Sequence, residues 1–410
     1  MLANLSSDIK QYLIVTGNYW AFTLTDGALR MLVVLHFHSL GYSPLQIAML
    51  FLFYEIFGVI TNLCGGWLGA RIGLNRTMNT GLLLQVLALG MLLVPAAMLT
   101  VPWVMAAQAL SGIAKDLNKM SAKSAIKMLV PADAQNSLYK WVALLTGSKN
   151  ALKGVGFFLG GALLTVLGFA GAVLAMATGL LGVFLTSLLL LKRDLGRATN
   201  KPRFADIFSK DPAINYLSAA RMFLFSARDV WFVVALPVYL SQTLDWDHWQ
   251  TGGFLAAWVI AYGMVQALAP RVTGINNVAP DGRSALRWAC LLATVPALIA
   301  LALQYSSTGS TPAPAAILIV GLLVFGVVFA INSALHSYLI VSYARADGVS
   351  LDVGFYYMAN AMGRLLGTVL SGWVFQVAGL AACLWISFTM IVLTALISIR
   401  LPRHAQGLSS

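Results

Sequence analysis

The chain has 410 residues, of which 59% are hydrophobic and only 10% are charged, and its formal net charge is +12. Soluble globular proteins carry about 25% charged residues, so this composition excludes an ordinary soluble domain. The positive balance suits either nucleic acid or anionic lipid, and the placement of lysine and arginine decides between them.

Apolar segments of about 20 residues, long enough to cross a bilayer as helices, occur roughly twelve times. In the first part of the chain they are predicted at Tyr12–His36, Leu45–Arg71, Thr77–Leu99, Val101–Ile126, Leu138–Leu167 and Ala172–Leu191. The second part supplies Ile214–Leu240, Gln250–Ala269, Ser284–Gln304, Pro314–Val341, Val353–Val377 and Leu380–Ile399. The sequence therefore predicts an all-α polytopic membrane protein whose first helix is retained and is not a signal peptide.

Lysines and arginines gather in alternate connections between these spans. Arg71 and Arg76 follow the second span, and residues 192–213 hold six more. The opposite connections, around Gly41, Thr100, Gly168, Asp245, Thr308 and Gly379, hold none. The positive-inside rule then predicts that both termini lie in the cytoplasm, and the net charge needs no nucleic acid to explain it.

The basic segment 192–213 is predicted to be a cytoplasmic loop between two six-helix halves, residues 1–191 and 214–410. The halves share a pattern in the same register, Lys153-x-x-Gly156-x-x-x-Gly160-Gly161 in the fifth span and Arg364-x-x-Gly367-x-x-x-Ser371-Gly372 in the eleventh. Leu68-x-x-Arg71 and Leu268-x-x-Arg271 likewise end the second and eighth spans. Two such repeats are a known plan of secondary transporters, with the substrate site near the midplane.

The segment GGWLGARIGLNR (residues 65–76) resembles the gating-loop motif of the major facilitator superfamily, through Gly66, Leu68, Arg71, Gly73 and Arg76. Ala70 stands where that motif has an acidic residue, which departs from the family's inter-helix charge relay. GFFLGG (residues 156–161) is similar to the family's antiporter-type motif, and small residues at this spacing let helices pack closely. The resemblance implies the major facilitator fold, in which helices one, four, seven and ten line the central cavity.

Charged side chains inside the spans indicate function, because each costs about 2.5–3.5 kcal/mol at the bilayer centre. Eight cations, Arg30, Lys115, Lys119, Lys149, Lys153, Arg221, Arg228 and Arg364, stand against four acids, Asp26, Glu55, Asp116 and Asp229. Pairing every acid leaves an excess worth about 10 kcal/mol on the same scale. A water-filled cavity that receives an anion accounts for this excess better than stability does.

The candidate substrate ligands are Arg30, Lys115, Lys119, Lys149, Lys153, Arg228, Arg364, His336 and Asn332. The four acids are candidate counter-charges or proton carriers. Asp26 and Arg30 lie four residues apart on one helical face, which suits a structural ion pair as well as a substrate clamp. His336 suits a packing residue as well as a ligand or proton site.

For several other charged residues the sequence favours a structural role. Arg228 and Asp229 are sequence neighbours that should point in different directions and pair with other helices. Lys123, Lys127 and Arg221 are expected to extend toward the cytoplasmic side, with their apolar stems in the membrane.

Lysine offers a point charge and arginine a planar fork, so together they suit a multiply charged, phosphate-like anion better than a multidrug substrate. The segments Thr16–Glu55, Gly112–Lys127 and Leu144–Gly161 resemble the organoarsenical efflux permeases (ArsJ type) of bacterial arsenate-resistance operons. That resemblance implies export of 1-arseno-3-phosphoglycerate across the bacterial inner membrane. It also implies a metabolic partner, a glyceraldehyde-3-phosphate dehydrogenase that makes this ester from arsenate.

Several alternatives stay open. The nearest is a carrier of another phosphorylated metabolite or of an inorganic anion. A membrane-embedded enzyme is disfavoured because no HExxH or GxSxG motif occurs, and a non-transporting sensor would need a longer soluble segment. Cys64, Cys290 and Cys383 lie far apart, so neither a thiol site for trivalent arsenic nor a metal or other cofactor is expected.

Overall fold

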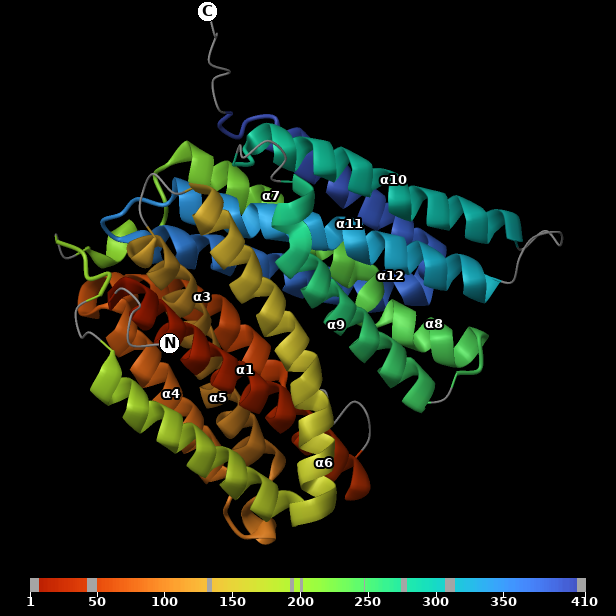
Figure 1. Cartoon of the computed structure of the whole chain (residues 1–410). Helices are drawn as coiled ribbons and strands as arrows, with labels where there is room; N and C mark the ends of the chain where they lie inside the picture. Colours follow the sequence, from red (N-terminus) through yellow and green to blue (C-terminus); the bar gives the residue numbers. More distant parts are fainter. Residues whose placement is uncertain are drawn as a thin grey trace, which may run out of the picture. The chain divides into compact units, whose positions relative to one another are not determined.

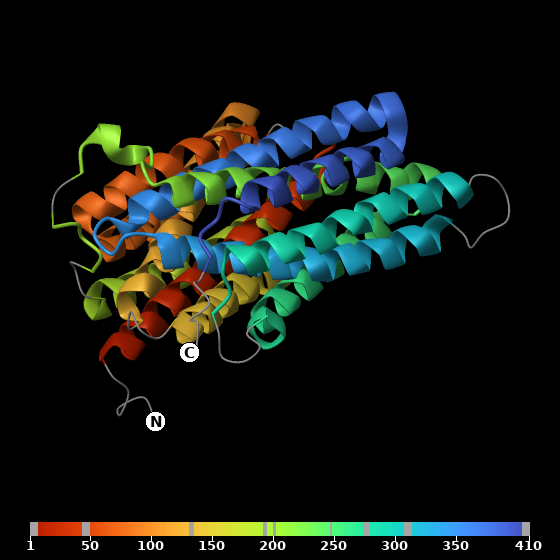
Figure 2. The same cartoon turned by 90° about the horizontal axis from the view of Figure 1, so that it is seen from above.

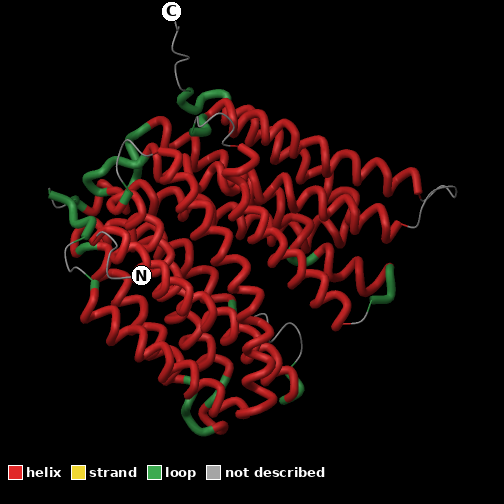
Figure 3. The backbone as a smooth tube through the Cα atoms, in the orientation of Figure 1, coloured by secondary structure: helices red, strands yellow, loops and turns green. Residues whose placement is uncertain are grey.

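The computed structural model describes residues 7–42, 50–130, 135–191, 195–199, 202–246, 248–273, 279–306 and 314–403. Within these ranges every regular element is helical, and Figure 3 shows helices joined by loops without a strand. The predicted all-α class is therefore confirmed. Residues 45–49 of the predicted second span, and Thr308, lie outside the described residues.

The chain forms two compact units, Met1–Ser209 with Ala344–Met358, and Lys210–Tyr343 with Ala359–Ser410. The first unit contains α1 (Ser7–Ser39), α3 (Leu52–Ile72), α4 (Leu74–Met91), α5 (Val101–Leu129), α6 (Gln135–Leu190) and the first turns of α12 (Val349–Ser398). Helix α1 runs beside α6 in Figure 1, and α5 packs on α3, α4 and α1. The predicted third span is too long: α4 ends at Met91, and the short 3-10 helix η2 (Ala96–Met98) follows Pro95, a residue that disfavours continuing a helix.

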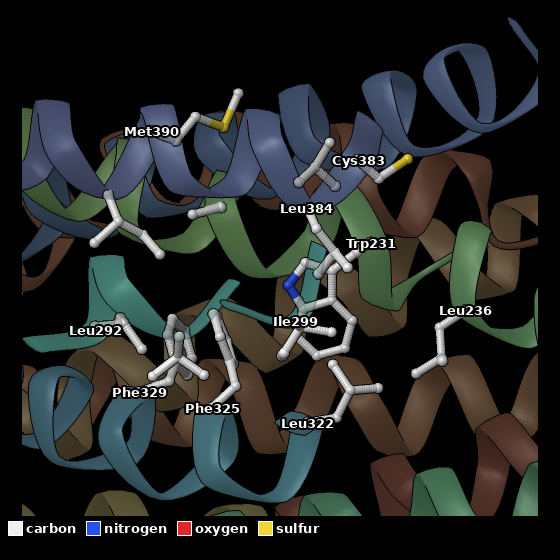
Figure 4. Close-up of a cluster of buried hydrophobic side chains, with 14 of the residues drawn as sticks. Trp231, Leu236, Leu292, Ile299, Leu322, Phe325, Phe329, Cys383, Leu384 and Met390 are labelled. Atoms are coloured by element: carbon white, nitrogen blue, oxygen red, sulfur yellow. The ribbon is translucent and has the colours of Figure 1, made fainter. Parts of the chain in front are cut away.

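The second unit contains α7 (Pro212–Phe232), α8 (Ala235–Thr243), α9 (His248–Thr273), α10 (Gly282–Ser306), α11 (Pro314–Tyr343) and the rest of α12. Helices α10 and α11 lie side by side in Figures 1 and 2, and α11 also packs on α9. The core joins α7, α8, α9, α10, α11 and α12. Figure 4 labels Trp231, Leu236, Leu292, Ile299, Leu322, Phe325, Phe329, Cys383, Leu384 and Met390 in it. In lipid, such contacts stabilise mainly through van der Waals packing.

Helices α6 and α12 each contain two predicted spans joined at one glycine. Gly168 has φ 67° and ψ −179°, and Gly379 has φ 75° and ψ −175°. This backbone region is essentially accessible only to glycine, because a Cβ would clash there. Each glycine stands at the same distance along the chain from its repeated cation, Lys153 or Arg364. The internal repeat seen in the sequence therefore extends to the backbone.

The predicted seventh span is interrupted, since α7 ends at Phe232 and α8 begins at Ala235. Pro237 explains the break, because a proline ring clashes with the carbonyl four residues earlier, here that of Val233. The backbone amides of Val234 and Ala235 both donate to Ser371 Oγ, at 3.3 and 3.0 Å. The serine of the repeated motif in α12 thus satisfies the backbone that the break leaves unpaired.

Small residues of the repeated motif bring helices into backbone contact. A Cβ on Gly156 of α6 would lie 2.6 Å from the carbonyl oxygen of Leu24 in α1. A Cβ on Gly367 of α12 would lie 2.7 Å from the carbonyl oxygen of Ser226 in α7. The close packing expected from the motif therefore occurs in both units.

Six described segments are long and apolar enough to cross a membrane: Gln135–Leu190, Pro212–Thr243, Gln250–Thr273, Gly282–Tyr305, Ala315–Tyr343 and Val349–Ser398. The first and the last of these each hold two spans, on either side of the glycine breaks. Helices α1, α3, α4 and α5 are not among these segments. Helices α1, α3 and α5 carry most of the ionisable residues of the first unit that are candidates for binding the substrate.

Candidate functional site

The first unit gathers six cations and three carboxylates on α1, α3, α5 and α6. These residues, named here the first cationic cluster, are Arg30, Lys115, Lys119, Lys123, Lys149 and Lys153 with Asp26, Glu55 and Asp116. Lys153 of α6 interacts electrostatically with Arg30 and Asp26 of α1, with Lys115 of α5 and with Lys149 of its own helix. Four-residue spacing puts Lys115, Lys119 and Lys123 on one face of α5.

Asp116 holds two lysines at once. Its side chain is 1% exposed, with Oδ1 2.5 Å from Lys119 Nζ and Oδ2 3.6 Å from Lys115 Nζ. Helix α3 approaches without an intervening side chain, since a Cβ on Gly58 would lie 2.9 Å from Asp116 Oδ2. One buried carboxylate is thus shared by two ammonium groups of the same helix.

Arg30 pairs with Glu55 of α3 and not with Asp26. The Arg30 Nη2 to Glu55 Oε1 distance is 3.1 Å. Asp26 is buried and accepts a hydrogen bond of 2.7 Å from the Tyr54 hydroxyl. Tyr54 thus binds Asp26 with its hydroxyl and contacts the Arg30 guanidinium with its ring, at 4.7 Å from the centroid. The structural Asp26–Arg30 pair that the sequence left open is replaced by these contacts.

Lys153 differs from Arg30, Lys115 and Lys119 in having no carboxylate at ion-pair distance within the described ranges. It is half-buried, and within the described part of the chain its ammonium has neither a hydrogen-bond nor an ion-pair partner. Lys149 donates to Asn150 Oδ1 at 3.4 Å. An anion that entered here would find an ammonium with its three donors available.

Lys123 does not extend toward the cytoplasmic side as expected. It is 3% exposed, and its ammonium donates to Thr146 Oγ1 of α6 at 3.0 Å. The expectation was wrong because the neighbouring helix supplies a hydroxyl at this depth, which the spacing of residues on α5 does not reveal. Lys127, one turn further along α5, is half-buried.

The second unit holds a smaller set, named here the second cationic cluster: Arg221, Arg228, Arg364 and Asp229. Asp229 is fully buried, with Oδ1 2.5 Å from Arg228 Nη2 and Oδ2 3.3 Å from Arg364 Nε. The expectation that Arg228 and Asp229 point apart was wrong, because the long arginine side chain folds back onto its neighbour. The expected pairing with another helix does occur for Asp229, through Arg364 of α12. Each unit therefore contains one buried carboxylate held by two cations.

Arg221 is also more deeply placed than expected. It is 3% exposed, and it donates to Asn360 Oδ1 at 2.9 Å and to the Ser333 carbonyl oxygen at 3.1 Å. The expected extension to the cytoplasmic side is therefore wrong, since α11 and α12 provide acceptors inside the unit. Arg221 also stacks on Phe225, 3.9 Å from the ring centroid.

The two predicted ligands on α11 differ in their surroundings. Asn332 donates to the carbonyl oxygens of Trp288 and Val328 at 2.8 and 3.1 Å, so it ties α11 to α10. His336 is fully buried beside Arg221, and within the described ranges neither of its ring nitrogens has a hydrogen-bond partner. The amide nitrogen of Asn332 is thus committed to packing, whereas its Oδ1 and both imidazole nitrogens of His336 have no hydrogen-bond partner in the described ranges.

Two tyrosines that the sequence did not single out lie under the lysines of the first cluster. Lys115 Nζ is 3.8 Å from the centroid of the Tyr54 ring. Lys119 Nζ and Lys123 Nζ are 4.9 and 4.8 Å from that of Tyr357. No local spacing could have found the Tyr357 contacts, because they join α5 to the first turns of α12.

The gating-loop residues, Gly66, Arg71, Gly73 and Arg76, lie where α3 passes into α4. Gly73, with φ 101°, separates the two helices, and its amide donates to the Gly69 carbonyl oxygen at 2.9 Å. The Arg71 guanidinium lies over the Trp67 ring, 5.1 Å from the centroid. Ala70 packs in an apolar group with Leu351, so this position contributes packing where the family motif has a charge.

No group of three histidine, cysteine, aspartate or glutamate side chains in the described ranges is placed to hold a metal ion. Cys64, Cys290 and Cys383 are free thiols.

A family model described as the Major Facilitator Superfamily matches residues 13–351. The chain belongs to the major facilitator superfamily. As such it is a multi-pass membrane protein and a secondary transporter of small molecules, and the predicted fold is confirmed. A comparison with curated protein sequences finds no match.

Solved structures of other transporters share the fold along nearly the whole chain. The human organic anion transporter MFSD10 (TETRAN) has a TM-score of 0.74 at 16% identity, covering 96% of this chain and 100% of that one. A bacterial homologue of the iron transporter ferroportin has 0.72 at 13%, covering 96% and 99%. The E. coli fucose:proton symporter has 0.70 at 11%, covering 95% and 98%. At these identities the likeness shows the fold alone.

Proposed function

We propose that this major facilitator exports 1-arseno-3-phosphoglycerate across the bacterial inner membrane and thereby confers arsenate resistance. The observation that carries the proposal is the charge of the first cationic cluster, in which six cations stand against three carboxylates. A cargo with an arsenate and a phosphate group would compensate that excess.

The attraction between one cation of the cluster and one charged oxygen of the cargo can be given an approximate size. At an effective dielectric constant of about 20, two unit charges 4 Å apart attract by about 4 kcal/mol before the cost of desolvation. Lys153 offers such a contact without first having to leave a carboxylate. Lys115 and Lys119 share Asp116, so an arriving oxyanion would relieve repulsion between them as well.

The resemblance supports the identity of the anion. The three segments that resemble organoarsenical permeases, Thr16–Glu55, Gly112–Lys127 and Leu144–Gly161, contain every residue of the first cationic cluster. Membership of the superfamily supports transport and not catalysis. The metabolic partner in this proposal is a glyceraldehyde-3-phosphate dehydrogenase that forms the ester from arsenate, without a requirement for physical contact.

Complementation tests the proposal. A bacterial strain without arsenical exporters receives this gene, the dehydrogenase gene, or both, and its growth in arsenate is measured. Resistance should appear only with both genes, because the permease alone has no cargo. Lys153→Met should lose resistance, whereas Lys140→Met, an exposed lysine on the same helix, should keep it. No resistance with both genes, although the permease reaches the membrane, would contradict the proposal.

The alternative substrates are separated by direct transport. Everted vesicles are supplied either with the dehydrogenase system and arsenate, or with 3-phosphoglycerate or inorganic phosphate alone. Uptake of arsenic should require the complete dehydrogenase system. Faster uptake of 3-phosphoglycerate or phosphate than of the arseno-ester would replace the proposal with a carrier of that anion.

A further inference from the structure

Two buried tyrosine rings in the first unit each lie under two cations. Tyr54 is 2% exposed and has Lys115 Nζ at 3.8 Å and Arg30 Cζ at 4.7 Å from its ring centroid. Tyr357 is 3% exposed and has Lys119 Nζ at 4.9 Å and Lys123 Nζ at 4.8 Å from its centroid. Four cations of the first cluster therefore rest on aromatic faces.

An aromatic face holds a cation without neutralising its charge and without occupying all of its N–H donors. The negative face of the ring attracts a cation, but it carries no net charge, so the cluster stays positive. A ring also occupies only one side of an ammonium that has three donors. A lysine held in this way keeps N–H groups for the oxygens of an anion, while its long side chain is confined.

The lysines of α5 show this division of contacts. Lys115 and Lys119 each have Asp116 on one side and a tyrosine ring on another. Lys123 has Thr146 in place of the carboxylate. The two tyrosine rings together thus contact all three lysines on this face of α5.

We infer that Tyr54 and Tyr357 are positioning residues, whose ring faces hold Lys115, Lys119 and Lys123 in the geometry that binds the anionic cargo. The inference rests on the proposed function. At Tyr357 the ring face is the active feature, so phenylalanine should replace it. At Tyr54 the hydroxyl has a second role, because it donates to Asp26.

Transport kinetics in everted vesicles test the inference, with the arseno-ester generated by the dehydrogenase system. Tyr357→Leu should raise the apparent KM by about tenfold, with a smaller change in maximal rate, because two supported lysines lose one neighbour each. Tyr357→Phe should keep the KM within about twofold of the native protein. Tyr12→Leu is the matched control, since that buried ring packs on Trp141.

A graded series separates the ring's electrostatics from its shape. Phenylalanine at position 357 is compared with its mono-, di- and trifluorinated forms, which weaken the negative face at nearly constant size. The KM should rise stepwise with fluorination. This series also covers the case in which Tyr357→Leu fails to fold.

The outcomes distinguish the positioning role of the tyrosine rings from the proposed transport function on which it rests. An unchanged KM for Tyr357→Leu and for the fluorinated series would overturn the positioning role, while uptake by the native protein would still support the function. An equal KM increase for Tyr357→Phe and Tyr357→Leu would assign the effect to the hydroxyl and reject the ring face. No uptake of arsenic by the native protein would remove the proposed function, and the inference with it.

Discussion

The Ser350 hydroxyl donates a hydrogen bond of 2.7 Å to the carbonyl oxygen of Gly66. This contact joins the first turn of α12 to α3, just before the gating loop. A Cβ on Gly66 would lie 2.5 Å from the Ser350 carbonyl oxygen and 3.1 Å from the Cα of Gly354. Gly66, the first matching glycine of the gating-loop motif, therefore lets the backbones of α3 and α12 come into direct contact.

Gly66→Ala should lower the thermal midpoint of the purified protein in detergent. The added methyl group meets rigid backbone, and overpacking of this kind costs about 1–3 kcal/mol. Gly90→Ala is the matched control, because a Cβ on Gly90 of α4 meets nothing within 4 Å. Alanine there should be neutral or slightly stabilising. Equal midpoints for the two variants would show that the crossing tolerates separation.

Asp116→Asn should destabilise the protein by leaving Lys115 and Lys119 without their shared carboxylate. Removing one partner of a buried ion pair costs about 3–5 kcal/mol, as an upper range for these partly exposed lysines. The double variant Asp116→Asn with Lys119→Met should recover part of the midpoint, since it removes one of the unpaired charges. A double variant less stable than Asp116→Asn would reject the shared-carboxylate account.

The deep cations should be needed for arsenate resistance. Lys115→Ala, Lys119→Ala, Lys153→Ala and Arg364→Ala should each abolish it at normal membrane levels, as measured by growth and immunoblotting. Lys123→Ala should be almost as damaging, because Lys123 is buried against Thr146. Lys127→Ala should be milder. Intact resistance in the first four variants would show that these cations do not bind the cargo.

The predicted orientation can be tested with single cysteines in a variant without Cys64, Cys290 and Cys383. A cysteine at Ala205, exposed in the basic segment, should react with a membrane-impermeant maleimide only after permeabilisation. A cysteine at Gln242, exposed near the end of α8, should react in intact cells. The opposite labelling pattern would invert the topology.

Export should be driven by the membrane potential without proton exchange. An inside-negative potential drives an anion outward by about 2.3 kcal/mol per charge per 100 mV, so a doubly charged cargo already has a downhill path. In everted vesicles, collapsing the potential should slow arsenic uptake, while collapsing only the pH gradient should not. The reverse result would assign proton coupling to an acid such as Asp26 or Glu55.

Much of the fold could be predicted because apolar length and the positions of glycine are local properties. The spans on either side of Gly168 and Gly379 are confirmed within the long helices α6 and α12. Pro237 is a sequence signal for the helix break after α7. It did not lead to a predicted break because the residues around it are apolar. The ionisable members of the two clusters were also visible, because charge inside a span stands out by composition.

Partners across helices could not be predicted in the same way. Arg30 reaches Glu55 and Arg228 folds onto Asp229, and both choices depend on helix rotation and side-chain length. Tyr357 meets Lys119 and Lys123 only because the first turns of α12 belong to the first unit. Such contacts carry no signature at any fixed spacing in the chain.

The breaks at Gly168 and Gly379 have a consequence for synthesis of the protein. No hydrophilic loop separates the two spans of α6, or those of α12, so each pair should enter the bilayer from the ribosome as one hairpin. A nascent chain that is truncated shortly after Gly168 would contain the fifth span without the sixth, which is its partner in the hairpin. In a cell-free insertion assay such a chain should be extracted by alkali more readily than one that continues to Leu190.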